Sequence, residues 1–583
     1  MSPNEERSIN WWGFAITVVV SIVVAWLVIS IRKSAQLLGP TEEYAAIAAT
    51  LPEWWWSHGN LHDWLLVGPD AGNWAANARA WMEGSSLDSH RLPAYTALAA
   101  TAGERFGDVV FGGHMVNHYI SCATALVALA IGVAAGGVAV GAGAALLTAL
   151  SPELVNNQLL YGVDPTFQFA AALLALSTLL AVRAPAKSPW ALILSLAVGC
   201  CAGLAAATHY LGLVFAPVAL VTLTLLRPLG GRRWIGLALA LAATAGLWVF
   251  ATSRYSDLTI TQIFSIFTQG VAGSDGRVTG PAHMSDGQAA GIVAANLWSA
   301  PGLAIQRGLR SLAVGLIPWS LLMGLFWVGL ADLRGLTPGA PFRPRDVRWR
   351  AGLTLLFILT PLIALEAARA PDRYALFSRP LIFVVVVNGI GNVARAAALV
   401  ISRLGGLRKA GGLLGHALSA AAILWYVAAM RPPFEQRWEL RPPLGEGMVD
   451  REISVAISSA LPSSRGVVTT SQAIPFYTGM PACPTSQCLP GGPQQNAQCI
   501  YRILRECSGS GPIPYLVVSS LNAGLGNQPL TELDTLIGER FETLSTARTR
   551  NYSVTAYALE RPALRQLGEE LASQGQGGAA LTP

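Results

Sequence analysis

Two acidic residues of this chain could do acid–base chemistry, one within a long loop and one at the edge of a long apolar run. Asp70 begins a stretch with helical spacing that carries Trp74 and Trp81, and Asp164 directly precedes another apolar run. Ionisable residues at the edge of a bilayer are costly to keep there and usually mark function or partnered structure. A carboxylate in such a place can take a proton from a hydroxyl group. Asp70 could also serve only as a helix cap, because aspartate is a favoured N-cap residue.

Basic side chains at the ends of other apolar runs could bind an anion. These are His209, Arg373 and Arg379. Arginine suits phosphate because its planar guanidinium can donate two parallel hydrogen bonds. For the two arginines, contact with lipid headgroups at the membrane surface is the competing interpretation.

These residues are positioned by a chain that is too apolar for a soluble fold. Of its 583 residues, 52% are hydrophobic and only 12% are charged, whereas soluble domains carry about 25% charged residues. Each long apolar run can cross a hydrocarbon core of roughly 30 Å. We therefore predict an α-helical polytopic membrane protein with about eleven transmembrane helices. The predicted spans are 11–31, 115–133, 134–150, 165–183, 189–205, 207–226, 233–251, 309–331, 351–368, 380–400 and 412–430.

The positions of the basic residues predict how the chain crosses the membrane. They fall on alternate loops: Arg183 and Lys187, then Arg227, Arg232 and Arg233, then Arg334, Arg343, Arg345, Arg348 and Arg350, and finally Arg403, Arg408 and Lys409. Basic loops stay on the cytoplasmic side. We expect a bacterial-type inner membrane protein with a cytoplasmic N-terminus and an extracytoplasmic C-terminal domain. Arg32 and Lys33 oppose this orientation. The positive charge is explained by the loops, so no nucleic-acid partner is expected.

The first run, 11–31, is too long for a signal-peptide core and lacks a small-residue cleavage site, so we expect it to be retained as a helix.

The chain divides into three parts by composition. Residues 1–430 hold the spans and two outer loops, 32–114 and 252–308, and residues 564–583 are predicted to be disordered. Residues 431–563 alternate helix-like and strand-like segments, which predicts a small α/β domain. Its expected elements are a helix near 448–461, strands at 466–470 and 515–519, a helix near 530–540 and a last strand pair ending at Leu559.

Four cysteines lie in the C-terminal domain: Cys483, Cys488, Cys499 and Cys507. In an oxidising compartment four cysteines predict two disulfides. A zinc site is the alternative, but the spacing lacks paired C-x-x-C knuckles.

The outer-loop motifs resemble the GT-C superfamily of membrane glycosyltransferases, in particular its protein O-mannosyltransferase and lipid A aminoarabinose transferase branch. The resemblance covers roughly residues 10–430 and includes the predicted layout of spans. The matching residues are the segment 70–84, then Arg91, Pro93 and Tyr95, then Pro152 and Asp164, and finally Arg373 and Tyr374.

The sequence departs from the family pattern in three places. The family usually places its first acid soon after the first span, so Glu42 or Glu43 could replace Asp70 as the catalytic acid. His209 stands where many members carry lysine. Asp70 is followed by Ala71 rather than by a second acid, which puts a shared metal site in doubt.

The resemblance implies an inverting transferase that moves a sugar from a polyprenyl-phosphate donor to a glycan, lipid or protein acceptor on the outer face. Such a reaction needs a base for the acceptor hydroxyl and cations for the departing phosphate. We expect Asp70 to be the base and Asp164 to orient the acceptor or a cation. The expected phosphate partners are Arg373, Arg379 and His209, and the expected substrate contacts are Arg91, Tyr95 and Tyr374.

A divalent cation is the one cofactor left open, and the metal ligands stay unknown. The i, i+4 pairs His58/His62 and His114/His118 could hold zinc or copper on helices, although no catalytic glutamate lies between them.

Two rival functions remain. A transporter or flippase of a lipid-linked substrate would show repeat symmetry and ionisable residues at the bilayer midplane. A scaffold that acts through its C-terminal domain would make the outer-loop acids dispensable.

Overall fold

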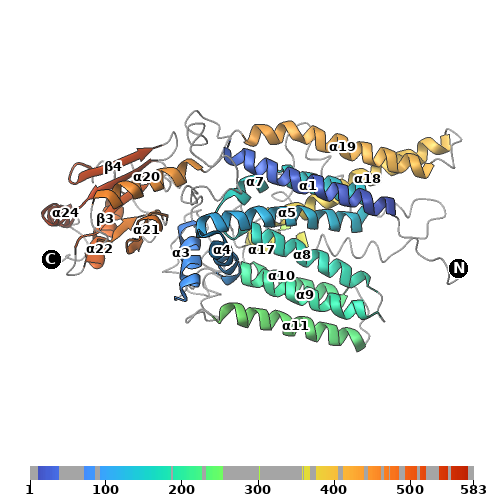
Figure 1. The fold of residues 1–583 in the computed structure, drawn as a ribbon, viewed down its shortest axis with the longest axis horizontal. Coiled ribbons are helices and arrows are strands. Elements are labelled where there is room, and N and C mark those ends of the chain that lie inside the picture. The colour runs from blue at the N-terminus through green and yellow to red at the C-terminus, as the bar shows by residue number, and fades with distance from the viewer. Residues whose placement is uncertain are drawn as a thin grey trace.

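The long apolar runs of the sequence fold into helices that lie side by side in a bundle (Figure 1). They are α1 (Trp11–Leu37), α5 (Val109–Gly136), α6 (Val138–Leu150), α8 (Asp164–Arg183), α9 (Pro189–Thr208), α10 (Gly212–Leu225), α11 (Gly231–Thr252), α17 (Thr360–Ala367), α18 (Arg379–Leu404) and α19 (Gly411–Trp438).

A computed structural model supplies this architecture and describes most but not all of the chain. The described residues are 11–37, 71–85, 92–184, 188–209, 211–225, 231–253, 301–302, 357–358, 360–367, 376–404, 411–438, 444–460, 465–469, 471, 473–484, 493–508, 512–519, 538–548 and 553–574.

Within the described residues, five helices are long and apolar enough to cross a membrane. They comprise α5, α8, α9, most of α11 from Trp234 onward, and the segment Leu376–Ala398 around the start of α18. Shorter apolar segments occur in α1, α6, α10 and α19. At 1.5 Å per residue a helix of about 20 residues spans the hydrocarbon core. The chain is therefore a multi-pass membrane protein.

Two predicted span boundaries are wrong. α5 continues to Gly136, and the break before α6 falls at Gly137, whose φ of 97° is open to glycine at little cost. α9 continues to Thr208 and α10 begins only at Gly212, so the predicted start of a span at 207 lies inside the preceding helix. Hydropathy is continuous across the break at Gly137 and could not locate it. The predicted span 309–331 and most of 351–368 lie outside the described residues.

Three helices outside the spans lie at one end of the bundle, beside the C-terminal domain (Figure 1). α3 (Ala71–Glu83) confirms the helix expected after Asp70 and ends at Gly84, whose φ is 69°. α4 (Pro93–Phe106) begins with proline at its first turn. α7 (Pro152–Leu159) connects α6 to α8. In Figure 1, α3 runs across the long axes of the bundle helices.

The C-terminal domain contains a five-stranded sheet with the order β2-β1-β3-β5-β4. The strands are β1 (Val467–Thr469), β2 (Ala482–Pro484), β3 (Tyr515–Ser519), β4 (Glu542–Arg548) and β5 (Ser553–Ala558). β1 is parallel to β2 and β3, and β5 is antiparallel to β3 and β4. The helices are α20 (Leu444–Ala460), α21 (Ala473–Thr478), α22 (Pro493–Ser508) and α24 (Arg561–Gln574).

The strand-like runs, the last strand pair and the helix near 448–461 are confirmed as β1, β3, β4, β5 and α20. Most of the helix expected near 530–540 lies outside the described residues. The predicted disorder from 564 onward is wrong as far as Gln574, because α24 occupies that stretch. Leu564, Leu567 and Leu571 are buried on one side of α24. This narrow apolar stripe stabilises a helix that its Gly, Gln and Ala content had obscured.

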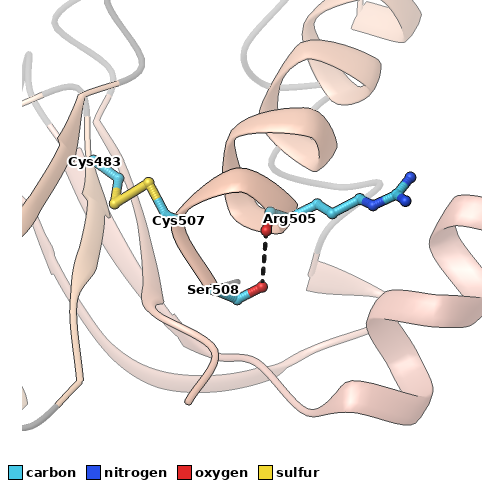
Figure 2. Close-up of a disulfide and its surroundings, with 4 residues drawn as sticks. All are labelled: Cys483, Arg505, Cys507 and Ser508. Carbon is cyan, nitrogen blue, oxygen red and sulfur yellow. Dashed lines mark hydrogen bonds between the residues drawn. A yellow bond between two sulfur atoms is a disulfide. The ribbon is translucent and has the colours of Figure 1, made fainter. Parts of the chain in front are cut away.

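A disulfide joins Cys483 on β2 to Cys507 at the end of α22 (Figure 2). The hydroxyl of Ser508 donates a hydrogen bond to the Arg505 carbonyl at 3.1 Å and closes the last turn of that helix. Cys499 is also disulfide-bonded, and Cys488 lies outside the described residues. A disulfide within the C-terminal domain is thus confirmed, although it joins the two of the four cysteines that are furthest apart in sequence. The sulfurs of Cys483, Cys499 and Cys507 are not available as zinc ligands.

Candidate functional site

Antiparallel packing of the spans brings several predicted site residues to one end of the bundle. α8 starts at Asp164, and α9 packs against it and returns to His209. α18 starts at Arg379. All three residues therefore lie at helix ends on the side of α3, α4 and α7.

Phe167 joins these three helix ends. It lies one turn after Asp164 on α8 and is only 3% exposed. The centroid of its ring lies 4.8 Å from that of His209 and 5.9 Å from that of Phe377, which is two residues before Arg379. Sequence reasoning missed Phe167, because an aromatic residue inside an apolar run carries no special signal.

His209 is held in one orientation by the turn between α9 and α10. Its backbone N–H donates to the Ala205 carbonyl at 3.1 Å, and its Nδ1 accepts the backbone N–H of Leu211 at 3.2 Å. An imidazole that accepts at Nδ1 carries its proton on Nε2 when neutral. Neutral His209 can therefore offer an Nε2–H donor to an anion.

Arg379 is buried and forms an ion pair with a residue that sequence reasoning missed. Its Nη1 lies 3.6 Å from Oε2 of Glu153 on α7. The hydroxyl of Ser151 donates to the same carboxylate oxygen at 3.2 Å. The available signal was the acid directly after Pro152, between two apolar runs. A phosphate bound at Arg379 would share this guanidinium with Glu153.

Asp164 is the first residue of α8 and is partly buried. A carboxylate in the first turn of a helix is stabilised by the helix dipole, typically by about 0.3–1 kcal/mol. This contribution is small, so the dipole alone gives little reason to keep an acid at the membrane edge.

The first turn of α3 lies against the turn that leads into Asp164. A Cβ atom added to Gly162 would lie 3.6 Å from Cδ1 and Nε1 of Trp74. Trp74 also makes an edge-to-face contact with Tyr95 on α4, with ring centroids 5.5 Å apart. Asp70 directly precedes α3 in sequence. Four predicted site residues lie outside the described residues: Asp70, Arg91, Arg373 and Tyr374.

Tyr95, predicted to contact substrate, has no exposed surface and packs as core. Its ring contacts Tyr161 edge-to-face at 5.8 Å, and its hydroxyl donates to the Gly113 carbonyl at 3.5 Å. The Tyr161 hydroxyl donates to the Val109 carbonyl at 3.1 Å. Burial raises the pKa of both phenols, so both stay neutral. Tyr95 therefore supports α3 from the interior of the protein.

Buried polar side chains hold the connection between α7 and α8 in place. Asn117 on α5 donates through Nδ2 to the Leu160 carbonyl at 2.7 Å. Gln158 donates through Nε2 to Oε1 of Gln168 at 3.3 Å. Asn117 in α5 and Gln168 in α8 each interrupt an apolar run, and this is the signal that could have identified them. These bonds fix the turn from which Asp164 starts.

The described residues contain no group of three or more His, Cys, Asp or Glu side chains that could hold a metal ion. His114 and His118 are buried on α5, and His58 and His62 lie outside the described residues. A cation at Asp70 would therefore need ligands from beyond these residues.

No protein family and no curated protein matches the sequence, but solved structures match the fold. ArnT from Cupriavidus metallidurans, solved bound to undecaprenyl phosphate, is 14% identical with a TM-score of 0.51. The match covers 94% of this chain and 98% of that chain.

A second fold match is the archaeal oligosaccharyltransferase AglB from Archaeoglobus fulgidus, solved with an inhibitory peptide and a dolichol-phosphate. It is 12% identical with a TM-score of 0.52, over 94% of this chain and 74% of that chain. The Archaeoglobus fulgidus oligosaccharyltransferase was also solved with Zn and sulfate. That structure is 13% identical with a TM-score of 0.50, over 88% of this chain and 70% of that chain. The chain has the GT-C fold, as the sequence resemblance predicted.

Proposed function

We propose that this chain is an inverting membrane glycosyltransferase that moves a sugar from a polyprenyl-phosphate donor to an acceptor on the outer face of the membrane. Two structures with the same fold were solved with undecaprenyl phosphate and with a dolichol-phosphate, which supports a lipid-phosphate donor. In this proposal residues 1–430 form the transferase domain and 431–563 form an extracytoplasmic domain. α19 carries the chain across that boundary to Trp438.

The observation that carries the proposal is the meeting of separate chain segments at one end of the bundle. Phe167 brings the starts of α8 and α18 together with His209. Trp74 brings the start of α3 onto the turn before Asp164. A carboxylate and two basic groups at one end of the bundle, Asp164, His209 and Arg379, match what this transfer requires.

In the proposed reaction the acceptor oxygen forms a bond to the anomeric carbon of the sugar while the bond from that carbon to the phosphate oxygen breaks. The electrons of the broken bond stay on the phosphate, and the hydroxyl proton goes to the Asp70 carboxylate. Attack opposite the leaving group inverts the anomeric centre. Arg373, Arg379 and His209 stabilise the departing polyprenyl phosphate.

The remaining predicted residues have supporting roles in this proposal. Asp164 orients the acceptor, and Arg91 and Tyr374 contact substrate. Tyr95 acts indirectly, because it is fully buried and contacts Trp74. Whether Asp164 does this through a divalent cation is decided by titration with EDTA.

Features at both ends of the bundle support an orientation with the C-terminal domain outside the cytoplasm. The disulfide-bonded domain lies at the site end, and disulfides persist in oxidising compartments. Arg183 and the start of α11, with Arg232 and Arg233, lie at the opposite end, as expected for a cytoplasmic side. We infer a bacterial-type inner membrane and a cytoplasmic N-terminus.

The test uses the full chain in nanodiscs with undecaprenyl-phosphate mannose or undecaprenyl-phosphate aminoarabinose and an envelope extract as acceptor source. We expect release of undecaprenyl phosphate. Asp70→Asn should slow the release by about 10² to 10⁴ and leave folding nearly unchanged, because asparagine caps a helix but cannot accept the proton.

Glu42→Gln and Glu43→Gln are the matched comparisons for Asp70→Asn. Loss of activity in either one, with Asp70→Asn fully active, would mean that the base is Glu42 or Glu43. Absence of release with both donors would contradict the proposal. Donor movement across the bilayer would then identify a flippase.

A further inference from the structure

Helix α21 of the C-terminal domain belongs to two hydrophobic cores at once. Ala473 is buried in the cluster formed by α3, α4 and α5. The next residue, Ile474, is buried in the core of the α/β domain. Phe476 and Tyr477 pack against the first of these clusters. Figure 1 shows α21 next to α3, where the α/β domain meets the bundle.

A cation–π pair joins α21 to α3. Cζ of Arg79 on α3 lies 4.0 Å from the ring centroid of Phe476. A guanidinium within about 6 Å of an aromatic ring is attracted to its negative face. The contact fixes the side of α3 that faces the C-terminal domain, while Trp74 fixes the side that faces α4.

Both ends of α21 are held by the C-terminal domain. The backbone N–H of Ala473 donates to Oγ of Ser471 at 3.3 Å, and the Ser471 hydroxyl donates to Oδ2 of Asp450 on α20 at 2.5 Å. Asp450 is buried. At its other end the helix stops at Gly479, whose φ of 66° suits glycine, and the next residue, Met480, is buried in the core of the α/β domain. A short helix anchored at both ends can transmit position, because it has little freedom to bend.

We propose that Phe476 and Arg79 are positioning residues, through which the C-terminal domain holds α3 and thereby keeps Trp74 against the turn that leads into Asp164. This inference rests on the proposed function, since it assigns α3 a role in transfer. The C-terminal domain then contributes to turnover without binding the donor.

The contact itself can be tested without any activity. Hydrogen–deuterium exchange of the full chain in nanodiscs would compare wild type with Phe476→Leu and Arg79→Met. Both variants should raise deuterium uptake in residues 71–83, because the helix loses its contact on one side. Uptake in α3 that is unchanged in both variants would overturn the proposal.

The positioning role is tested by separating binding from turnover. Undecaprenyl phosphate affinity should stay within about twofold in both variants, whereas release from undecaprenyl-phosphate mannose should slow by about ten- to a hundredfold, since small displacements of a catalytic group have effects of this size. The double variant should be little worse than either single variant, because both break one contact. In contrast to Phe476→Leu, the Phe476→Tyr variant should release undecaprenyl phosphate at the wild-type rate, because tyrosine keeps the aromatic face.

Arg465→Met is the matched control. Arg465 lies over the ring of Tyr515 at 5.0 Å, a cation–π pair inside the C-terminal domain that does not involve α3. The Arg465→Met variant should release undecaprenyl phosphate at the wild-type rate, and its deuterium uptake in α3 should equal that of wild type.

The outcomes separate this inference from the proposed function. Faster exchange in α3 with unchanged release would overturn the positioning role and leave the transferase intact. If wild type neither binds nor releases undecaprenyl phosphate, the proposed function fails and the positioning role fails with it, while the exchange result still decides whether α21 holds α3.

Discussion

Helices α8 and α11 are both apolar enough to cross a membrane, yet they have opposite surroundings. In the most apolar stretch of α8, 78% of the residues are buried within the protein, whereas in α11 only 11% are buried. α8 lies inside the bundle and α11 at its edge (Figure 1). α11 presents side chains such as Phe250, 74% exposed, to the surroundings.

The two helices differ in the residues at their ends on the site side. α8 begins with Asp164 and carries Phe167 and Gln168 in its first turns, and each of these contributes to the site. α11 reaches the same end with Val249 and Phe250, both exposed. Apolar length therefore identifies a span, but a polar or charged residue at the end of a span identifies the helix that builds a site.

The largest expected difference between the two helices is in stability. Phe167→Ala should lower the free energy of unfolding by about 3–5 kcal/mol, because it empties a packed position between three chain segments. Phe250→Ala removes the same atoms from an exposed position and should change the unfolding free energy by much less. Unfolding in nanodiscs measures both, and equal losses would contradict the placement of α11 at the edge of the bundle.

The next effect concerns turnover. Asp164→Asn should slow release of undecaprenyl phosphate by about a hundredfold, since it disturbs the orientation of the acceptor. The free energy of unfolding of this variant should fall by no more than about 1 kcal/mol, the size of the interaction between a charge and a helix dipole. Phe250→Ala on α11 serves as the activity control and should release product at the wild-type rate. Full activity of Asp164→Asn would contradict a role for the start of α8 in transfer.

A substitution where α9 packs against α11 should lower stability and leave turnover unchanged, the reverse of Asp164→Asn. A Cβ atom on Gly199 would overlap the backbone of Ala240 on α11, so Gly199→Ala should destabilise the protein by about 1–3 kcal/mol. Turnover per folded molecule should stay at the wild-type level, because no site residue lies at this crossing. A loss of turnover as large as that of Asp164→Asn would mean that α11 also contributes to the site.

The smallest expected effect concerns the ion pair of α7. Glu153→Gln should tighten undecaprenyl phosphate binding by roughly three- to tenfold, or about 0.7–1.4 kcal/mol, because Arg379 no longer shares its charge with a carboxylate. Glu104→Gln, an exposed acid on α4, is the control and should leave the affinity unchanged. Unchanged affinity in Glu153→Gln would mean that Arg379 fastens α18 to α7 and does not bind phosphate.

The bundle was predictable because span length and hydrophobicity have a direct physical cause in the thickness of the bilayer. The break at Gly137 was not, because it depends on a single backbone angle inside continuous apolar sequence. α24 was missed because three leucines on one side of a helix are a weak signal in a segment rich in Gly, Gln and Ala.

The site was predictable only in its charged members. Asp164, His209 and Arg379 stand out in an apolar chain, and the structure gathers their helices at one end. Glu153, Phe167 and Phe476 gain their meaning from partners that are distant in sequence, and spacing alone does not reveal such contacts. Tyr95 was a plausible substrate contact in sequence but is fully buried against Trp74 in the structure.

The configuration of the anomeric carbon tests the central claim most directly. The full chain in nanodiscs would receive undecaprenyl-phosphate mannose labelled with ¹³C at the anomeric carbon, together with envelope acceptor, and NMR would follow the labelled carbon. We predict one molecule of undecaprenyl phosphate for each sugar transferred, with the configuration of that carbon inverted in the product. Retention of configuration, or an intact donor after incubation with an active acceptor fraction, would contradict transfer by direct attack at this site.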